Sequence, residues 1–398
     1  MLRYVQDLWS AFFPTEAVFP LQVVGRSGAA VESQEELGKA LADTFLIFTY
    51  RDGFEAIPAV TRLIETDQGW GCLLRTSQML LAHFLWAHGR PADRRLALFF
   101  DHSAETAPFS IHNLIRSVWN QRAFKAEYWS PSQGCEAIKR TMQDAIRTEQ
   151  LQTRVTVVTS TNGCVYADEV HHTFKQGAEV VLVLASVRVS AAAQLTQESY
   201  LQIEKLMEQP QCLGIVGGVP GRSYYFFAHN QTQLFYLDPH QRTTAALLSD
   251  GPSATVSVTP SVSDVRCVHW SRVDTSLFLA FAVTTRDEWA ALEVHLSNRF
   301  MHVESQRSLH DGDQFAPARQ GHTNGTFVSP LRMGNRCEMN GAAGDLPLSE
   351  TALLVQRRTL RVPRGRRQGS EAGTATDATA ERNAGEDELD TDSWEYLD

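Results

Sequence analysis

The feature that most constrains this chain is a change of composition near residue 303. Residues 35–303 contain regular apolar segments that can build a buried core, whereas residues 304–398 have few such runs. Within that second part, residues 357–367 carry six arginines and residues 381–398 carry eight acids. Such sequences bury too little apolar surface to offset the entropy lost on ordering. We therefore expect residues 304–398 to be a largely disordered tail.

Hydrophobic periodicity inside the body predicts a mixed α+β fold. Helices are expected at 35–50, where the helix runs into an aromatic-rich segment, and at 72–87, 133–149 and 197–208. Strands are expected at 154–159, 179–187, 213–217, 223–229, 233–237, 265–269 and 277–283. The short connection Asn230-Gln231-Thr232 indicates an antiparallel hairpin. The body should combine one central helix with a C-terminal run of antiparallel strands.

Charge and cysteine spacing exclude several classes of protein. A net charge of −10 makes the chain a poor general binder of nucleic acid or anionic lipid. No apolar stretch is long enough for a membrane span, and the N-terminal sequence lacks the features of a signal peptide. The six cysteines include no CxxC pair, which argues against a disulfide framework or a zinc site. We therefore expect a reduced, cytoplasmic protein.

Cys72 is the first candidate for chemistry. It follows Gly69-Trp70-Gly71 and begins the expected helix 72–87. A thiol at a helix N-terminus meets the positive end of the macrodipole, which favours the nucleophilic thiolate. The alternative is a buried, inert cysteine that begins a core helix, and on this feature alone that case is the commoner one.

Asp238 and His240 form a second candidate at the end of strand 233–237. Two residues apart on an extended segment, their side chains point the same way, so the carboxylate can fix the imidazole tautomer and leave the other nitrogen for a thiol. Pro239 stiffens the segment between them. The alternative is a simple turn at a strand end.

Two further segments carry possible functional groups. Tyr50 can donate a hydrogen bond to an oxyanion, although a structural aromatic is the alternative. The segment Gly217-Gly218-Val219-Pro220-Gly221 is expected to be a mobile loop near a cleft. A phosphate cradle is disfavoured there because a strand follows and no lysine is present. Histidines 102, 112, 171 and 172 form no metal-binding pattern, and structural roles are expected for them.

Taken in order, these segments resemble the Atg4 (autophagin) family of papain-like cysteine proteases. The motifs that carry the resemblance are Phe48-Thr49-Tyr50-Arg51, the run from Gly69 to Arg75 with Gln78-Met79, Pro108-Phe109-Ser110-Ile111-His112, the run from Leu213 to Pro220 with Ser223-Tyr224-Tyr225-Phe226, and Leu237-Asp238-Pro239-His240. They cover residues 40–245, and a weaker match continues over 265–300.

The resemblance implies a papain-like α+β fold with a small inserted domain. It divides the chain into an N-terminal extension (1–34), a catalytic domain (35–303) with an insertion at about 120–185, and the tail (304–398). The implied activity is hydrolysis after the C-terminal glycine of Atg8, a ubiquitin-like protein, both in its precursor and in its conjugate with phosphatidylethanolamine. No metal or cofactor is implied.

The resemblance also implies roles for single residues. Cys72 is the nucleophile, His240 its base, Asp238 the group that orients His240, and Tyr50 an oxyanion donor beside the Cys72 N–H. The segment Gly217–Gly221 lifts to admit the substrate. Either Tyr128 or Trp129 covers the cleft, because Tyr128-Trp129-Ser130-Pro131 replaces a Trp-Tyr-Gly-Pro-like stretch. Thr76 stands where many relatives have a second cysteine, so redox control is not expected there.

The tail contains a second functional pattern. Trp394-Glu395-Tyr396-Leu397, preceded by acids, fits the Trp-x-x-Leu pattern of Atg8-interacting motifs, whose Trp and Leu fill pockets on the partner. The alternative is an acidic solubilising tail. The arginine-rich run at 357–367 can touch anionic lipid, although a solvated linker is favoured.

We expect a monomer that contacts autophagic membranes transiently and binds no nucleic acid. Two other functions stay open from the sequence. One is a papain-like isopeptidase for another ubiquitin-like protein, because the Trp-Gly-Cys and Asp-Pro-His motifs do not read the substrate. The other is an inactive adaptor that binds Atg8 through Trp394 and Leu397, although intact Cys72, Asp238 and His240 argue against it.

Overall fold

The structure is a computed structural model, which describes residues 19–25, 30–88, 96–119, 124–151, 153–160, 163–240, 244–247, 258–297 and 301–304. The helices are α2 (Gln34–Thr44), α3 (Cys72–Ala87), α5 (Ile111–Val118), α6 (Pro131–Arg147), α7 (Ala167–Lys175), α8 (Gln197–Met207) and α9 (Arg286–Leu296). Short 3-10 turns lie at Leu96–Phe99, Val262–Asp264 and Trp270–Arg272. The strands are β1 (Gln22–Val23), β2 (Arg51–Pro58), β3 (Leu63–Thr66), β4 (Val155–Thr159), β5 (Cys164–Tyr166), β6 (Val180–Arg188), β7 (Cys212–Val219), β8 (Arg222–His229), β9 (Gln233–Leu237), β10 (Thr244–Ala245), β11 (Val265–His269), β12 (Ser276–Val283) and β13 (His302–Glu304).

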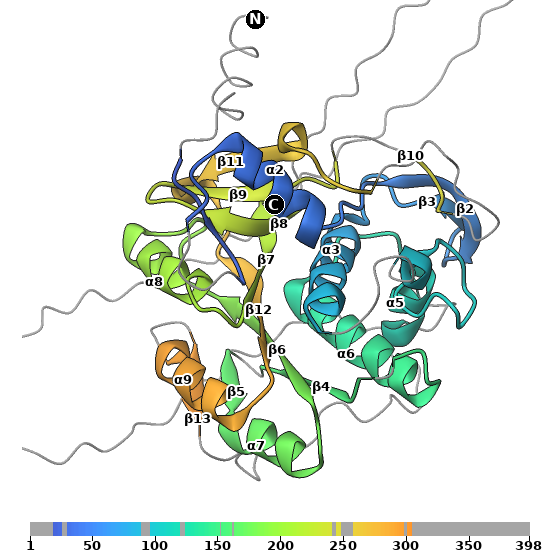
Figure 1. Cartoon of the computed structure of the whole chain (residues 1–398). Coiled ribbons are helices and arrows are strands. Elements are labelled where there is room, and N and C mark those ends of the chain that lie inside the picture. The colour runs from blue at the N-terminus through green and yellow to red at the C-terminus, as the bar shows by residue number, and fades with distance from the viewer. Residues whose placement is uncertain are drawn as a thin grey trace, which may run out of the picture. The chain divides into compact units, whose positions relative to one another are not determined.

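One eight-stranded sheet forms the centre of the body (Figure 1). Its order is β11-β9-β8-β7-β12-β6-β4, and β1 pairs with β8 off this path. Every pairing is antiparallel except β4 with β6, which is parallel. Strands β7, β8 and β12 are buried along nearly their whole length, as expected for strands covered on both faces.

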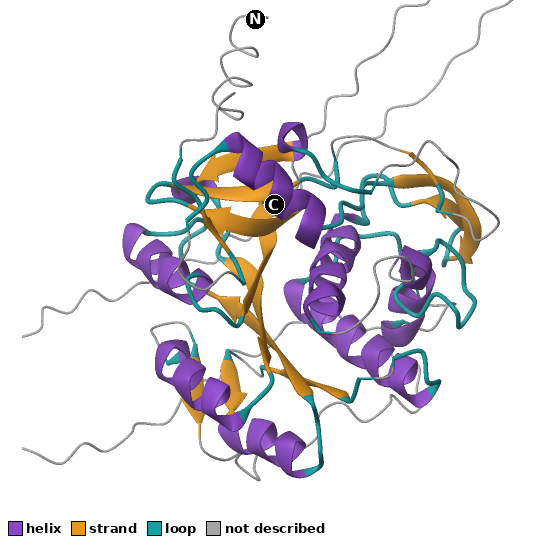
Figure 2. Cartoon of the chain, in the orientation of Figure 1, coloured by secondary structure: helices purple, strands orange, loops and turns teal. Residues whose placement is uncertain are grey.

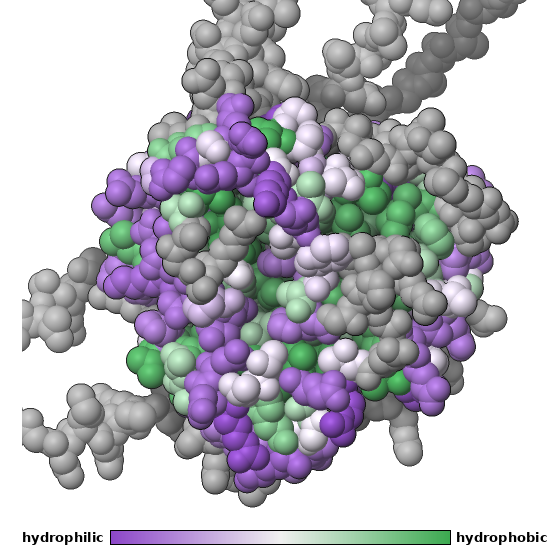
Figure 3. Space-filling model, in the orientation of Figure 1, coloured by the Kyte–Doolittle hydropathy of each residue, from purple (hydrophilic) through white to green (hydrophobic). Residues whose placement is uncertain are grey.

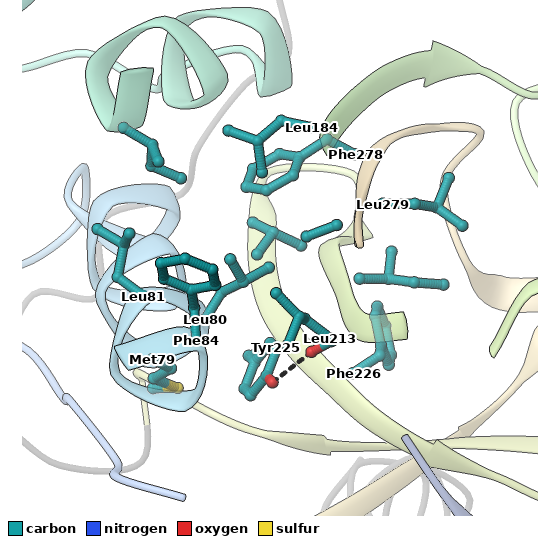
Figure 4. Close-up of a cluster of buried hydrophobic side chains, with 14 of the residues drawn as sticks. Met79, Leu80, Leu81, Phe84, Leu184, Leu213, Tyr225, Phe226, Phe278 and Leu279 are labelled. Carbon is teal, nitrogen blue, oxygen red and sulfur yellow. Dashed lines mark hydrogen bonds between the residues drawn. The ribbon is translucent and has the colours of Figure 1, made fainter. Parts of the chain in front are cut away.

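Helix α3 is the buried helix of the body. All its residues from Cys72 to Leu85 are buried, and the helix packs on β7 and β8. In Figure 4, Leu80 and Phe84 of α3 face Leu213 and Tyr225 of the sheet. Burying one such apolar side chain contributes about 1.5–3 kcal/mol, so this interface fixes α3 firmly against the sheet. The beginning of α3, where Cys72 lies, is thereby held beside β8.

Helices α3, α5 and α6 lie together on one side of the sheet, and α8 lies on the other (Figure 2). The start of α6 is fixed by a capping box, in which Ser130 and Gln133 each accept a bond from the other's backbone N–H, and by Pro131 at its first position. A second, three-stranded sheet of order β10-β2-β3 stands beside the start of α3. Tyr50 immediately precedes β2 in this small sheet.

The main predictions of the fold are confirmed. All seven predicted strands exist, each within two residues of its predicted ends, and the four predicted helices begin within two residues of their expected starts. The aromatic-rich segment after Thr44 is not helical, and α2 ends there. Strands β2 and β3 and helices α5, α7 and α9 were not predicted.

The structure corrects the prediction of a loop at Gly217–Gly221. Gly217, Gly218 and Val219 belong to β7, and only Pro220 and Gly221 form the turn to β8. Glycine is needed at positions 217 and 218 because neighbouring strands approach closely there. A Cβ at Gly217 would collide with Leu277, and one at Gly218 with the backbone of Arg222. Gly221 has φ +77°, which suits the third position of a type II turn after proline.

The domain boundaries remain predictions. The described residues show which elements lie near each boundary. Part of the N-terminal extension packs with the body, since β1 pairs with β8 and Leu21 is fully buried. Strands β4 and β6 of the expected insertion lie in the main sheet, and α6 packs on α3. The tail from residue 305 onward, with the arginine run, Trp394 and Leu397, lies outside the described residues.

The outer face over α2 and around α7 is largely hydrophilic (Figure 3). This agrees with the amphipathic character of α2, whose buried residues are Leu37, Ala40 and Leu41. Within the part of the chain that the structure describes, no helix has the length and apolar character needed to cross a bilayer.

Candidate active site

Cys72 lies at the first position of α3, and its side chain is 2% exposed. The residue before it, Gly71, has no side chain to accept hydrogen bonds from the N–H groups of the first helical turn. Those N–H groups therefore stay available to an anion at the start of the helix, where the macrodipole favours negative charge. The location suits both a thiolate and an oxyanion that forms beside it.

Asp238 and His240 directly follow β9, and a carboxylate oxygen of Asp238 binds His240 twice. Asp238 Oδ1 accepts from the backbone N–H of His240 at 2.8 Å and from the ring Nδ1 at 2.7 Å. The carboxylate is an acceptor only, so it fixes the proton on Nδ1 and points Nε2 away from itself. The spacing predicted from the sequence is thus realised as a closed turn.

Cys72 and His240 meet through a hydrogen bond between their side chains. Burial of the ring disfavours the charged imidazolium, but hydrogen bonds to Asp238 and Cys72 and their negative charges favour it more, and the pKa of His240 rises to about 9. At neutral pH the ring therefore keeps its proton when Cys72 carries a negative charge. This is the ion pair that a thiol nucleophile needs.

Tyr50 completes the group on the side of the small sheet. Its ring lies edge-on to His240 with ring centroids 5.2 Å apart, and its hydroxyl hydrogen-bonds to Cys72. Burial, the negative charge of Cys72 and that hydrogen bond raise the pKa of Tyr50 well above its ordinary value, so the hydroxyl remains a donor. Its backbone N–H donates to the carbonyl of Pro239 at 3.0 Å, which fixes Tyr50 against the Asp238–His240 turn.

A buried network of charged side chains, which was not predicted from the sequence, lies next to these residues and holds their backbone in place. Arg75 donates to Asp67 at 2.6 Å and to Asp101 at 2.8 Å, and all three side chains are fully buried. Asp67 also accepts from the backbone N–H of Arg51, the residue after Tyr50, at 2.6 Å. Burial alone would lower the pKa of Arg75, but Asp101 and Asp67 raise it above its ordinary value. The network ties α3, β2 and the turn before Cys72 together.

A signal for this network was present in the sequence. Arg75 is the only arginine, lysine or carboxylate in the largely apolar segment 72–87, and a charge at a buried position requires a partner. The partners could not be identified from the sequence, because Asp67 lies 8 residues before Arg75, outside the helix, and Asp101 lies 26 residues after it.

The two lid candidates differ in their surroundings. Tyr128 is 61% exposed, and it lies close enough to Tyr50 to act on the ionisation of that residue. Trp129 is 7% exposed and belongs to the hydrophobic core. Of the two candidates, Tyr128 is therefore the exposed one.

Two further sequence features have structural explanations. Thr76, at the position of the missing second cysteine, bonds the Ser223 hydroxyl of β8 at 2.9 Å and so links α3 to the sheet. His112 is buried and bonds the carbonyl of Glu55 at 2.6 Å, which connects α5 to β2. His171 and His172 lie on α7, and among the described residues no set of three metal-binding side chains converges.

Comparison with known sequences decides the family. The peptidase C54 catalytic domain matches residues 35–295. The chain belongs to the peptidase C54 family. Three relatives are a probable cysteine protease ATG4 of Pichia angusta (30% identity, 64% of this chain, 55% of the relative), one of Meyerozyma guilliermondii (30%, 73% and 65%) and the cysteine protease ATG4 of Pyricularia oryzae (29%, 61% and 57%).

Peptidase C54 membership confirms the predicted Atg4-type resemblance and, with the mixed helix–sheet body, the papain-like α+β fold. Residues 35–295 are a cysteine-peptidase catalytic domain. The chain spans a little more than half the length of the first of these relatives. The C54 match also covers Cys72, Asp238, His240 and Tyr50, the side chains that the geometry brings together.

Proposed function

We propose that this chain is a cytoplasmic thiol protease that cleaves after the C-terminal glycine of an Atg8-type ubiquitin-like protein in autophagy. The observation that carries the proposal is Cys72 at a helix N-terminus, hydrogen-bonded to both His240 and Tyr50. Family membership and relatives named cysteine protease ATG4 support the substrate class. We further propose that the chain acts as a monomer on the precursor and on the conjugate with phosphatidylethanolamine.

The proposed reaction proceeds by way of a thioester. The Cys72 thiolate attacks the glycine carbonyl carbon, and the oxyanion accepts bonds from the Cys72 N–H and the Tyr50 hydroxyl. The imidazolium of His240 gives its proton to the leaving amine as the C–N bond breaks. A water molecule then attacks the thioester and loses a proton to His240. The C–S bond breaks, which restores the thiolate and releases the acid.

Access to Cys72 is proposed to depend on two neighbouring elements. The thiol is almost fully covered, so substrate entry requires some group to move. We propose that the hairpin tip at Pro220 and Gly221 shifts together with Tyr128. A glycine at the cleavage site suits such a narrow entry, because it has no side chain.

The direct test is incubation with an Atg8-type protein extended beyond its C-terminal glycine. We expect a product whose mass corresponds to cleavage after that glycine. Cleavage of another ubiquitin-like protein in preference to this one would favour the isopeptidase alternative. Binding of the Atg8-type protein without any product would favour the inactive adaptor.

Substitutions in the Asp238–His240 turn should differ in severity. We expect His240→Ala to lower kcat by about 10²–10⁴-fold, because His240 transfers the protons. Asp238→Ala should lower kcat less, because Asp238 orients the ring and does not transfer protons. Steady-state cleavage of the extended precursor measures both. An Asp238 variant more severely impaired than the His240 variant would contradict these roles.

Activity should fall as the pH rises through about 9. The leaving amine needs the proton of His240, and that proton is lost above the raised pKa of the ring. A pH profile of kcat/KM checks the upper limb. In Asp238→Asn the fall should begin at lower pH, because the bond to the carboxylate is one cause of the raised pKa. If kcat/KM of the wild type and of Asp238→Asn falls over the same alkaline pH range, the assignment of this fall to His240 would be contradicted.

We also propose that Trp394 and Leu397 in the tail bind the Atg8-type partner, and that the arginine run at 357–367 adds a transient membrane contact. A second, tethered contact raises the local substrate concentration. A chain shortened at about residue 380 should therefore bind the partner more weakly while kcat changes little. Titration of the Cys72→Ala forms of both lengths measures this, and equal affinity would remove Trp394 and Leu397 from the proposal.

A further inference from the structure

Arg222 is an exposed cation beside the active site that the mechanism above does not use. It begins β8 directly after the turn at Pro220 and Gly221. Its side chain shares a face of the strand with Tyr224, because residues two apart on a strand point the same way. The two side chains are joined by a hydrogen bond between the guanidinium and the tyrosine hydroxyl.

Tyr224 places this cation on the His240 side of the cleft. The ring of Tyr224 is buried, stacks on Tyr236 with centroids 4.2 Å apart, and lies edge-on to His240 at 5.7 Å. Because the Tyr224 ring is packed on two sides, its hydroxyl has a fixed position. The hydrogen bond to that hydroxyl fixes the position of the Arg222 guanidinium as well. Arg222 lies within electrostatic reach of Asp238 and Tyr50.

Within the described part of the chain, no carboxylate lies close enough to neutralise the charge of Arg222. Among the residues that the structure describes, none of the ion pairs within 4.0 Å includes Arg222. Asp238 acts on it from farther away and is engaged with His240. A guanidinium that is exposed, oriented and without an ion-pair partner in the described ranges has donors left for an anion from outside, and its planar fork matches phosphate well.

The direction of the reaction indicates which part of a substrate reaches Arg222. His240 must give its proton to the leaving amine, so the leaving group lies on the His240 side of Cys72. Because Tyr224 lies against His240 and bonds Arg222, a group attached to that amine can extend past Tyr224 toward Arg222. In an amide of phosphatidylethanolamine, only two methylene groups and one ester oxygen separate the amine nitrogen from the phosphorus.

We propose that Arg222 binds the phosphate of the leaving group when the enzyme cleaves the ethanolamine-phospholipid conjugate. The inference rests on the proposed function and adds a binding residue for the lipid headgroup. An acidic residue after the glycine of a precursor offers the same negative charge, so the two sources must be separated by experiment.

The test uses the full chain and three soluble substrates built on one Atg8-type protein that ends at its glycine. That glycine is joined to glycerophosphoethanolamine, to ethanolamine, or to a short peptide that begins with aspartate. We expect the wild-type chain to cleave the phosphodiester substrate with a kcat/KM about fivefold above that of the ethanolamine amide, a ratio typical of one partly exposed charge-assisted contact. Added salt should reduce this preference.

Variants at Arg222 then show whether this residue causes the preference for the phosphodiester substrate. Arg222→Ala should remove the fivefold preference and leave cleavage of the ethanolamine amide unchanged. Arg222→Lys should retain part of it, because the charge remains and the planar fork is lost. Arg286→Ala, which removes an exposed arginine at the start of α9, should keep the full preference.

Several outcomes would overturn the proposal. Equal slowing of the phosphodiester and ethanolamine substrates by Arg222→Ala would show that Arg222 acts on the reacting carbonyl or on the fold. A preference that survives Arg222→Ala would place the phosphate site elsewhere. Slowing confined to the aspartyl substrate would assign Arg222 to precursor recognition. Failure of the wild type on all three substrates would reject the proposed function itself, which is a separate result.

Discussion

Cys72→Ala should abolish cleavage, with kcat reduced by more than about 10⁴-fold, while affinity for the substrate stays within about twofold of wild type. The loss is large because no other group near the cleft supplies a nucleophile in the proposed mechanism, and catalytic residues that act as a unit fail together. Affinity is retained because the change removes one small, nearly buried atom. Product mass and a binding titration measure the two effects. Retained cleavage would reject the nucleophile assignment.

Labelling with a thiol-reactive probe at neutral pH supplies the control. Cys135, Cys164, Cys212 and Cys267 are also buried, and burial raises the pKa of Cys212 to about 12 and that of Cys267 to about 11. We therefore expect labelling within the described body to be lost in Cys72→Ala and kept in Cys212→Ala. Equal labelling of both variants would indicate an unreactive Cys72 and favour the adaptor alternative.

The parts of the fold that were predicted correctly are those with undisturbed periodicity. Strands β6, β7, β8 and β12 are continuous apolar runs bounded by turn residues, and α3 carries an unbroken helical pattern. Strand β2 lacks such regularity, because its buried residues Arg51, Phe54 and Ile57 are three apart and its register with β3 shifts within the strand. The period of two that identifies a strand is lost there.

Two missed helices did carry a usable signal. The buried residues of α9 are Trp289, Leu292 and Leu296, and those of α5 include Ile111 and Leu114, all at helical spacing. Both helices are short, and α9 also carries an exposed apolar residue, Val294, outside this spacing, so the pattern was weak. Their N-caps, Thr285 and Ser110, are further signals of a helix start.

The active site was predictable only in part from local sequence. The pairing of Asp238 with His240 followed from their spacing, because the contact is local. The meeting of Cys72, Tyr50 and His240 joins three distant segments and was expected only through the family resemblance. The glycines at 217 and 218 were misread because glycine permits both a mobile loop and a close strand contact, and the sequence does not distinguish these uses.

The buried pair of Asp67 and Arg75 should be the most sensitive charged contact in the body. Asp67→Asn leaves the two buried arginines, Arg51 and Arg75, with Asp101 as the remaining carboxylate of the network. An uncompensated buried charge is costly, so we expect the free energy of unfolding to fall by about 3–5 kcal/mol. Urea unfolding measures this loss. Activity should fall as well, because Asp67 holds the backbone of Arg51 beside Tyr50.

Two comparisons separate the buried pair from a general effect of charge removal. Glu136→Gln breaks the exposed pair with Arg140 and should cost less than about 1 kcal/mol. Joining Asp67→Leu with Arg75→Met removes one charge of each sign and leaves Arg51 with Asp101, so this double variant should be more stable than Asp67→Asn. If the double variant regains stability but not activity, the network positions Tyr50 and Cys72 as well as stabilising the fold. A cost for Asp67→Asn no larger than that for Glu136→Gln would show that the buried charges do not need each other.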